Sequence, residues 1–88
     1  MIENPVIQVI ARICKAPDIS AAGIRELMQR LEMNEKSFAL LMNASPKTVQ
    51  MWASGITRPR NAARRLMQII QLNPDCINVL VEDEDVLY

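Results

Sequence analysis

The chain has 88 residues, half of them hydrophobic and only 3% aromatic, which predicts one domain with a single small aliphatic core. It contains no histidine, which excludes Ser-His-Asp catalysis, Cys-His catalysis and any zinc site with a histidine ligand. The formal net charge is zero, but residues 43–73 carry five cations and no acid, whereas residues 82–85 are four consecutive acids; this pattern indicates either an anionic partner for the basic segment or two solvated faces.

The first predicted helix covers residues 5–15. It has an Asn4 cap, Pro5 at its first position, and an end before Pro17. Ser20 is predicted to cap a second helix. In both segments apolar residues recur at the spacing of one helix face, and they are Val6, Ile7, Ile10, Ile13 and Cys14 in the first and Ile24, Leu27, Met28 and Leu31 in the second.

A third helix is predicted after an Asn34 cap, and a fourth after a Ser45 cap with Pro46 at its first position. Gly55 is predicted to end the fourth helix in the left-handed conformation. The residues expected to face the core are Phe38, Ala39, Leu41 and Met42 in the third helix and Val49 and Trp52 in the fourth.

Asn61 is predicted to cap a fifth helix, and Asn73 followed by Pro74 to open a sixth helical segment. The residues expected to face inward are Leu66, Met67, Ile69 and Ile70 in the fifth and Cys76, Ile77, Leu80 and Val81 in the sixth. Glycine is scarce and no segment alternates like a strand. The caps, prolines and periodicity together predict an all-α fold, a compact bundle of five to six short helices.

We expect three parts: an N-terminal helix or arm at residues 1–19, a helical domain at 20–81 and an acidic tail at 82–88. Cys14 and Cys76 lack the spacing of a metal site or redox motif, so both are expected to be buried free thiols. No metal and no cofactor is expected. Because no apolar run is long enough for a membrane and the N-terminus lacks a basic signal-peptide region, we expect a cytoplasmic protein.

Residues 35–52 have the spacing of a helix-turn-helix. The small side chain of Ala39 permits two helices to cross closely, and Asn43 stands where the chain must turn, often with positive φ. Val49 and Trp52 are expected to fix the second helix to the core and leave its other face free. Trp52 is therefore interpreted as core rather than as a stacking platform, and Met28, Met42 and Met67 as core rather than a partner groove.

The free face of this second helix carries residues suited to the edges of base pairs. Lys47 has donors for guanine, Gln50 has the groups to pair with adenine, and Met51 suits a thymine methyl. Its N-terminal end is Ser45-Pro46-Lys47, and recognition helices enter the major groove with their N-terminal residues foremost.

Residues 33–55 resemble the Cro/C1-type (Xre) helix-turn-helix, and residues 56–60 resemble the basic, proline-containing loop that closes that motif. The continuation over residues 61–74 is similar to HigA-like antitoxins and small antitoxin-linked regulators. The resemblance implies a lambda-repressor-like bundle that binds operator DNA, usually as a homodimer.

Three positions depart from that family's pattern. Glu35 stands where a glutamine usually contacts phosphate, so Asn34, Lys36 or the helix N-terminus would make that contact. Asn43 replaces the usual glycine of the turn, and Ala53 replaces a frequent glutamate that pairs with an arginine.

The predicted DNA-contacting residues lie at the start of the first motif helix, along the second and in the following loop, and they are Asn34, Lys36, Ser45, Pro46, Lys47, Thr48, Gln50, Met51, Arg58 and Arg60. We expect Arg58 and Arg60 to contact phosphate, whereas Arg64 and Arg65 are either helix-surface charges or further phosphate contacts. The acidic tail is interpreted as solvated, with a mimic of DNA as the alternative.

Together these expectations predict a sequence-specific DNA-binding transcriptional regulator, either a repressor or a HigA-like antitoxin with a RelE-like toxin as partner. The alternative is a protein-interaction module that has lost tight DNA binding. No enzyme is expected, because no polar pair has catalytic spacing and no phosphate loop is present. The apolar chain ends are expected to form a homodimer interface, a toxin-binding arm or part of the chain's own core. The operator, the regulated genes and the identity of any toxin stay open.

Overall fold

The structure, a computed structural model, describes residues 5–81, and this part of the chain is helical without a strand. The predicted all-α fold of five to six short helices is therefore confirmed. The elements in chain order are α1 (Pro5–Arg12), α2 (Ala21–Arg30), α3 (Glu35–Met42), α4 (Pro46–Ser54), α5 (Asn61–Leu72) and the 3₁₀ helix η1 (Pro74–Leu80). The expectations for the Asn4 cap, for the side chains of Val6 and Ile7 and for the tail at 82–88 lie outside the described residues.

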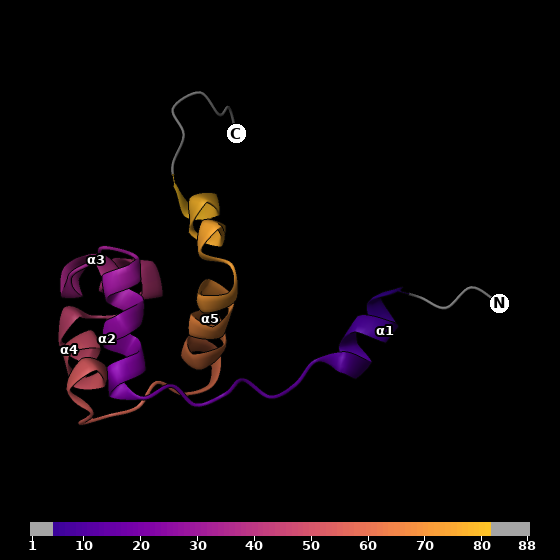
Figure 1. The fold of residues 1–88 in the computed structure, drawn as a ribbon, viewed down its shortest axis with the longest axis horizontal. Coiled ribbons are helices and arrows are strands. Elements are labelled where there is room, and N and C mark those ends of the chain that lie inside the picture. The colour runs from indigo at the N-terminus through magenta and orange to yellow at the C-terminus, as the bar shows by residue number, and fades with distance from the viewer. Residues whose placement is uncertain (1–4, 82–88) are drawn as a thin grey trace.

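Helices α2, α3 and α4 form one group, and α5 stands beside them with η1 continuing from its end (Figure 1). Helix α4 packs against both α2 and α3. Four helices contribute to one buried cluster, made of Ile24, Leu27, Met28, Phe38, Ala39, Met42, Val49, Trp52, Met67 and Ile70. The core interpretation of Trp52 and of the three methionines is thus confirmed. No helix in residues 5–81 combines the length and the apolar run that crossing a bilayer needs.

The predicted caps of α2, α3 and α4 are all confirmed. The Ser20 hydroxyl accepts a hydrogen bond from the Gly23 N–H, and the Asn34 side chain accepts one from Ser37. The Ser45 hydroxyl accepts one from the Thr48 N–H at 3.1 Å. Each cap satisfies one of the backbone donors that the first turn of a helix leaves without an intrahelical partner.

The predicted cap of α5 is wrong. The N-cap position belongs to Arg60, whose extended φ of −131° and ψ of 158° match that role, and no side chain among the described residues caps the helix. Asn61 is the first helical residue and has a left-handed φ of 52°, which asparagine tolerates better than most residues. Asn61 therefore lies at the start of the helix as predicted, but its role is to adopt the left-handed bend there rather than to accept hydrogen bonds from the first backbone N–H groups of the helix.

The sixth segment begins at Pro74 as predicted, but it is a 3₁₀ helix and the Asn73 side chain makes no capping hydrogen bond. Instead the N–H of Cys76 donates to the backbone carbonyl of Asn73 at 3.0 Å. The residues predicted to face inward from this segment are less buried than expected: Cys76 and Ile77 are half-buried, and Leu80 and Val81 are exposed. In α5, Ile69 is likewise exposed rather than in the core.

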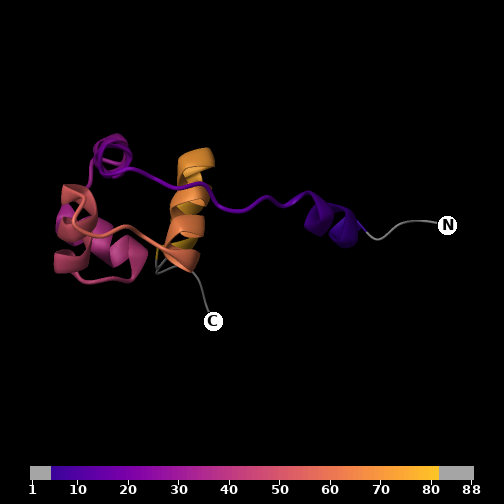
Figure 2. The ribbon, with the colours of Figure 1, turned by 90° about the horizontal axis from the view of Figure 1, so that it is seen from below.

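Helix α1 ends at Arg12, earlier than the predicted residue 15, and lies apart from the other helices in both ribbon views (Figures 1 and 2). Short helices without tertiary packing are marginal, which accounts for the early end. Cys14 follows the helix and is exposed, so the prediction that both cysteines are buried is wrong. Cys76 is half-buried, and both thiols are free.

The segment between α1 and α2 is held against the start of α5. The Arg64 guanidinium forms an ion pair with Asp18. Nη2 of Arg65 donates to the carbonyl of Cys14 at 2.7 Å, while its Nη1 donates to the side chain of Gln68 at 2.6 Å. Arg64 and Arg65 thus anchor the N-terminal segment, a role that the sequence analysis did not consider.

Candidate nucleic-acid interface

Helices α3 and α4 are joined by a turn of three residues, 43–45. Asn43 has φ 54° and ψ 45°, the left-handed conformation predicted for this position. The N–H of Ala44 donates to the carbonyl of Ala39 at 2.9 Å, which closes the end of α3. Ala39 is buried in α3, which packs against α4, and a small side chain there is compatible with a close approach of the two helices. The sequence thus builds a helix-turn-helix arrangement from a cap, a left-handed asparagine and an alanine.

Helix α4 has one buried and one free face. Val49 is fully buried and Trp52 is only 7% exposed, so they fix the helix to the core. Of the contact residues predicted along this helix, Lys47 and Gln50 are exposed on the other side, whereas Thr48 and Met51 are half-buried.

The N-terminal end of α4 is fixed by its own polar side chains. The hydroxyls of Ser45 and Thr48 lie 2.8 Å apart and share a hydrogen bond, in addition to the backbone bond that Ser45 accepts. Pro46 occupies the first position of the helix and is exposed. Three of the predicted contact residues therefore also form the helix start, which places the neighbouring Lys47 on a rigid backbone.

The C-terminal end of α4 is supported from α2. Gly55 has φ 82°, and the N–H of Ile56 donates to the carbonyl of Met51 at 3.0 Å. Nη1 of Arg25 donates to the carbonyl of Ala53 at 2.5 Å. Arg25 of α2 therefore contacts the backbone of α4 rather than a side chain. A cation near the C-terminal end of a helix also interacts favourably with the helix dipole.

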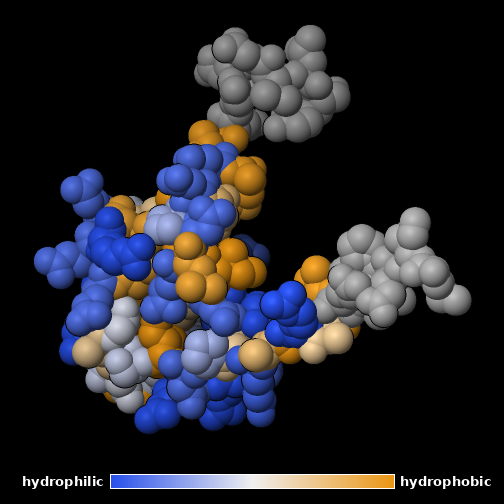
Figure 3. All heavy atoms as spheres, turned by 45° about the vertical axis from the view of Figure 1, so that its right-hand side comes forward, coloured by the Kyte–Doolittle hydropathy of each residue, from blue (hydrophilic) through white to orange (hydrophobic). Residues whose placement is uncertain are grey.

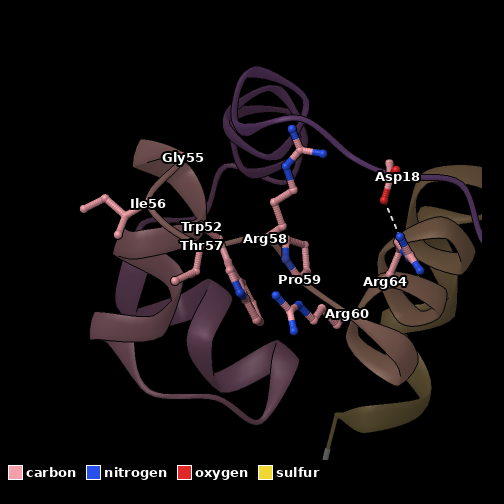
Figure 4. A pocket seen from close by; sticks show the side chains of 9 residues that line it. All are labelled: Asp18, Trp52, Gly55, Ile56, Thr57, Arg58, Pro59, Arg60 and Arg64. Carbon is pink, nitrogen blue, oxygen red and sulfur yellow. Dashed lines mark hydrogen bonds and ion pairs between the residues drawn. The ribbon is translucent and has the colours of Figure 1, made fainter.

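The loop after α4 forms one wall of a pocket of about 550 Å³ (Figure 4). Arg58 and Arg60 are exposed and flank the buried Pro59, beside the ring of Trp52. Arg64 and Asp18 close the other side as an ion pair. Nε of Arg64 is buried without a hydrogen-bond partner. The pocket therefore joins three guanidinium groups to a single carboxylate, a composition that suits an anion.

The start of α3 forms a separate hollow. Asn34 and Lys36 line it together with Glu35 and Met28, and the Asn34 side chain is already engaged as the helix cap. Lys36 and Glu35 are exposed neighbours of opposite charge. The predicted contact residues thus fall in three places, the start of α3, the free face of α4 and the arginine loop, rather than in one cleft.

Sequence reasoning missed Asp18 and Arg25 as parts of this region, and with them the pairing of Arg64 with Asp18. Asp18 and Arg25 contact groups 46 and 28 residues away along the chain, respectively, so no local pattern announces them. Within residues 5–81, no three side chains of the metal-binding types come together. Comparison with models of known protein families gives no match for this chain, and comparison with curated proteins gives none either.

Proposed function

We propose that the protein is a sequence-specific DNA-binding transcriptional regulator of the cytoplasm that inserts α4 into the major groove. The observation that carries the proposal is the two-sided character of α4. Its inner face is buried at Val49 and Trp52, while Lys47 and Gln50 stand exposed next to a rigidly capped helix start. A recognition helix needs this combination, because its N-terminal residues must reach base edges from a fixed backbone.

Positive charge next to α4 supports the proposal. Arg58 and Arg60 are exposed in the loop that follows the helix, and Lys47 is exposed in its first turn. Contacts to phosphate position a protein on DNA and supply most of its affinity for any sequence. Asn34 and Lys36 at the start of α3 are candidates for the phosphate contact that Glu35 cannot make.

A homodimer is part of this proposal, because two-fold symmetry would place two α4 helices about one turn of DNA apart. Two roles would use the same DNA-binding surface: that of a repressor, and that of a HigA-like antitoxin with a RelE-like toxin as partner. Co-expression with a RelE-like ribonuclease and co-purification would distinguish these two roles.

Titration of the purified chain with random and with selected duplex DNA tests the proposal. We expect affinity for random duplexes to fall steeply with salt, because each neutralised phosphate releases counterions and contributes about −0.9 to the logarithmic slope. Selection from randomised duplexes should then enrich one sequence. Failure of any duplex to bind at low salt would contradict the proposal.

The alternative, a protein-interaction module that no longer binds DNA tightly, has its own observations. Glu35 is exposed at the start of α3, and Asp18 places a carboxylate inside the arginine pocket. Leu40 is an apolar side chain within the motif and is 85% exposed on α3. A chain that binds a protein partner but shows no salt-dependent affinity for DNA would support this alternative.

A further inference from the structure

Two apolar areas of the described surface are uncovered in a single copy of the chain. The first is the arm, which we define as α1 together with Ile13. Its Val9, Ile10 and Ile13 side chains are 59%, 61% and 59% exposed. The second is a groove of about 560 Å³ between α3 and η1, whose apolar lining consists of Met33, Leu40, Leu41, Ile77, Leu80 and Val81. Figure 3 shows apolar residues gathered below the C-terminal segment and again along the arm.

The arm cannot reach the groove of its own chain while its base stays anchored. Arg65 holds the carbonyl of Cys14, and Arg64 holds Asp18, both at the first turns of α5. From Cys14 to Val9 the arm spans only about 12 Å, at ~1.5 Å per residue within α1 and at most ~3.8 Å for each of the two steps from Arg12 to Cys14. The groove residues of η1 lie roughly 20 Å further along, beyond the rest of α5 and most of η1.

We propose that the groove between α3 and η1 receives the arm of a second copy of this chain, so that two copies exchange arms about a two-fold axis. Because one chain carries both the apolar helix face and the apolar groove, a symmetric pair covers all four surfaces at once. A foreign helix would cover the groove and leave the arm exposed.

The exchange of both arms doubles the apolar area that the pair buries. Each contact brings Val9, Ile10 and Ile13 against Leu40, Leu80 and Val81, and these six side chains are 59–85% exposed in the single copy. At roughly 60–120 Å² per fully exposed aliphatic side chain, one contact buries about 240–470 Å². Two contacts bury about 480–940 Å², which is below the ~1,200 Å² of stable interfaces and predicts a weak, concentration-dependent dimer.

The polar lining of the groove suits an apolar arm. The polar residues inside the groove are uncharged, namely Ser37, Asn43 and Asn78. The described cations of the arm segment, Arg12 and Lys15, flank Ile13 rather than Val9 and Ile10. An arm that enters with Val9 and Ile10 would therefore bring no charge into the groove and meet none there.

Sedimentation of the full chain without DNA tests the exchange. We expect a dimer, and we expect Ile10→Gln and Leu40→Gln each to raise its dissociation constant at least ~100-fold, since each substitution is present in both contacts. Both side chains are exposed in the single copy, so circular dichroism should show unchanged helicity. Ile56→Gln, an equally exposed apolar site away from arm and groove, should leave the dimer intact. A chain that stays monomeric at ~100 μM, or a dimer that both variants leave unchanged, would overturn the proposal.

Cross-linking decides whether the arm comes from the second copy. In a Cys14→Ser, Cys76→Ala background, an Ile10→Cys chain is mixed with a Leu40→Cys chain and treated with a short bis-maleimide. We expect covalent pairs of one chain of each kind, and far fewer when Ile56→Cys replaces Leu40→Cys. A chain that carries both Ile10→Cys and Leu40→Cys and closes on itself at nanomolar concentration would show that the arm folds back, and the proposal would be wrong. None of these measurements involves DNA, so their failure is distinct from failure of the DNA-binding proposal.

Discussion

Helices α2, α3 and α4 differ from the two ends of the described chain, α1 and η1, although all five segments carry apolar residues at helical spacing. Each of the three central helices has a side-chain cap and a face buried against a neighbour. Within the described residues, η1 has no side-chain cap, and the apolar residues Val9, Ile10, Val79 and Leu80 of the two ends are exposed. The comparison teaches that apolar periodicity defines a helix face, whereas burial requires a second element for that face to contact.

Trp52→Ala should have the largest effect, because it removes an aromatic anchor from the central group. Truncation of a buried aromatic costs about 3–5 kcal/mol of unfolding free energy, which is most of the stability of a domain this small. We expect a largely unfolded protein by circular dichroism. Leu40→Ala, also on a central helix but at an exposed position, should melt near wild type. A well-folded Trp52→Ala protein that had lost only DNA affinity would contradict the core role of this residue.

Lys47→Ala and Gln50→Ala should leave stability unchanged and weaken binding to the selected operator, because both side chains lie on the free face of α4. Each lost base contact should cost about 1–3 kcal/mol of binding free energy, measured by fluorescence anisotropy. Arg58→Ala provides the contrast. It should weaken binding to all DNA sequences alike, and it should reduce the magnitude of the slope of log affinity against log salt concentration by ~0.9. Operator affinity equal to wild type in both α4 variants would mean that another face reads the DNA.

Ser45 and Asn61 both look like helix caps in the sequence, but substitutions at the two positions should change the unfolding free energy by different amounts. Ser45→Asn should be nearly neutral, because both residues cap helices well. Asn61→Ser should lower the unfolding free energy by about 1 kcal/mol, because Asn61 needs a left-handed φ rather than a capping oxygen. Urea melts of the two variants measure the difference. A neutral Asn61→Ser would indicate that Asn61 does cap α5.

Removal of residues 1–12 should have the smallest effect on the single copy. The described arm side chains Val9 and Ile10 are exposed, and the anchors at Cys14 and Asp18 remain. We expect a change within about 0.5 kcal/mol in the unfolding free energy, measured at a concentration where sedimentation finds monomers. A loss of several kcal/mol would place the arm in the core of its own chain.

The sequence predicted those parts of the fold that depend on short-range chemistry. The caps at Ser20, Asn34 and Ser45 each act within three residues, and the left-handed Asn43 and Gly55 follow from local backbone preference. The free and buried faces of α4 follow in the same way from the spacing of Val49 and Trp52, which is why Lys47 and Gln50 are exposed as expected, although Thr48 and Met51 are half-buried.

The misplaced features depend on groups that are distant in the sequence. Asn61 and Asn73 have the residue type of a cap, but the path of the chain sets their backbone angles outside the capping range. Cys14 lies on an apolar stripe, but its segment is held on α5 through its carbonyl, which leaves the thiol exposed. The arginine pocket likewise requires Asp18 to meet Arg64, and a single sequence contains no signal for that pair.

The two free cysteines differ in exposure, so their labelling rates report on two different parts of the native chain. A thiol reacts with a disulfide reagent only when the reagent can reach it. Cys14 is exposed and should be labelled fast, whereas Cys76 is half-buried against the core and should be labelled more slowly. The ratio of the two labelling rates therefore reports how well η1 shields its cysteine, without a substitution anywhere in the chain. Any partner that seats against η1 would slow the second rate and leave the first unchanged.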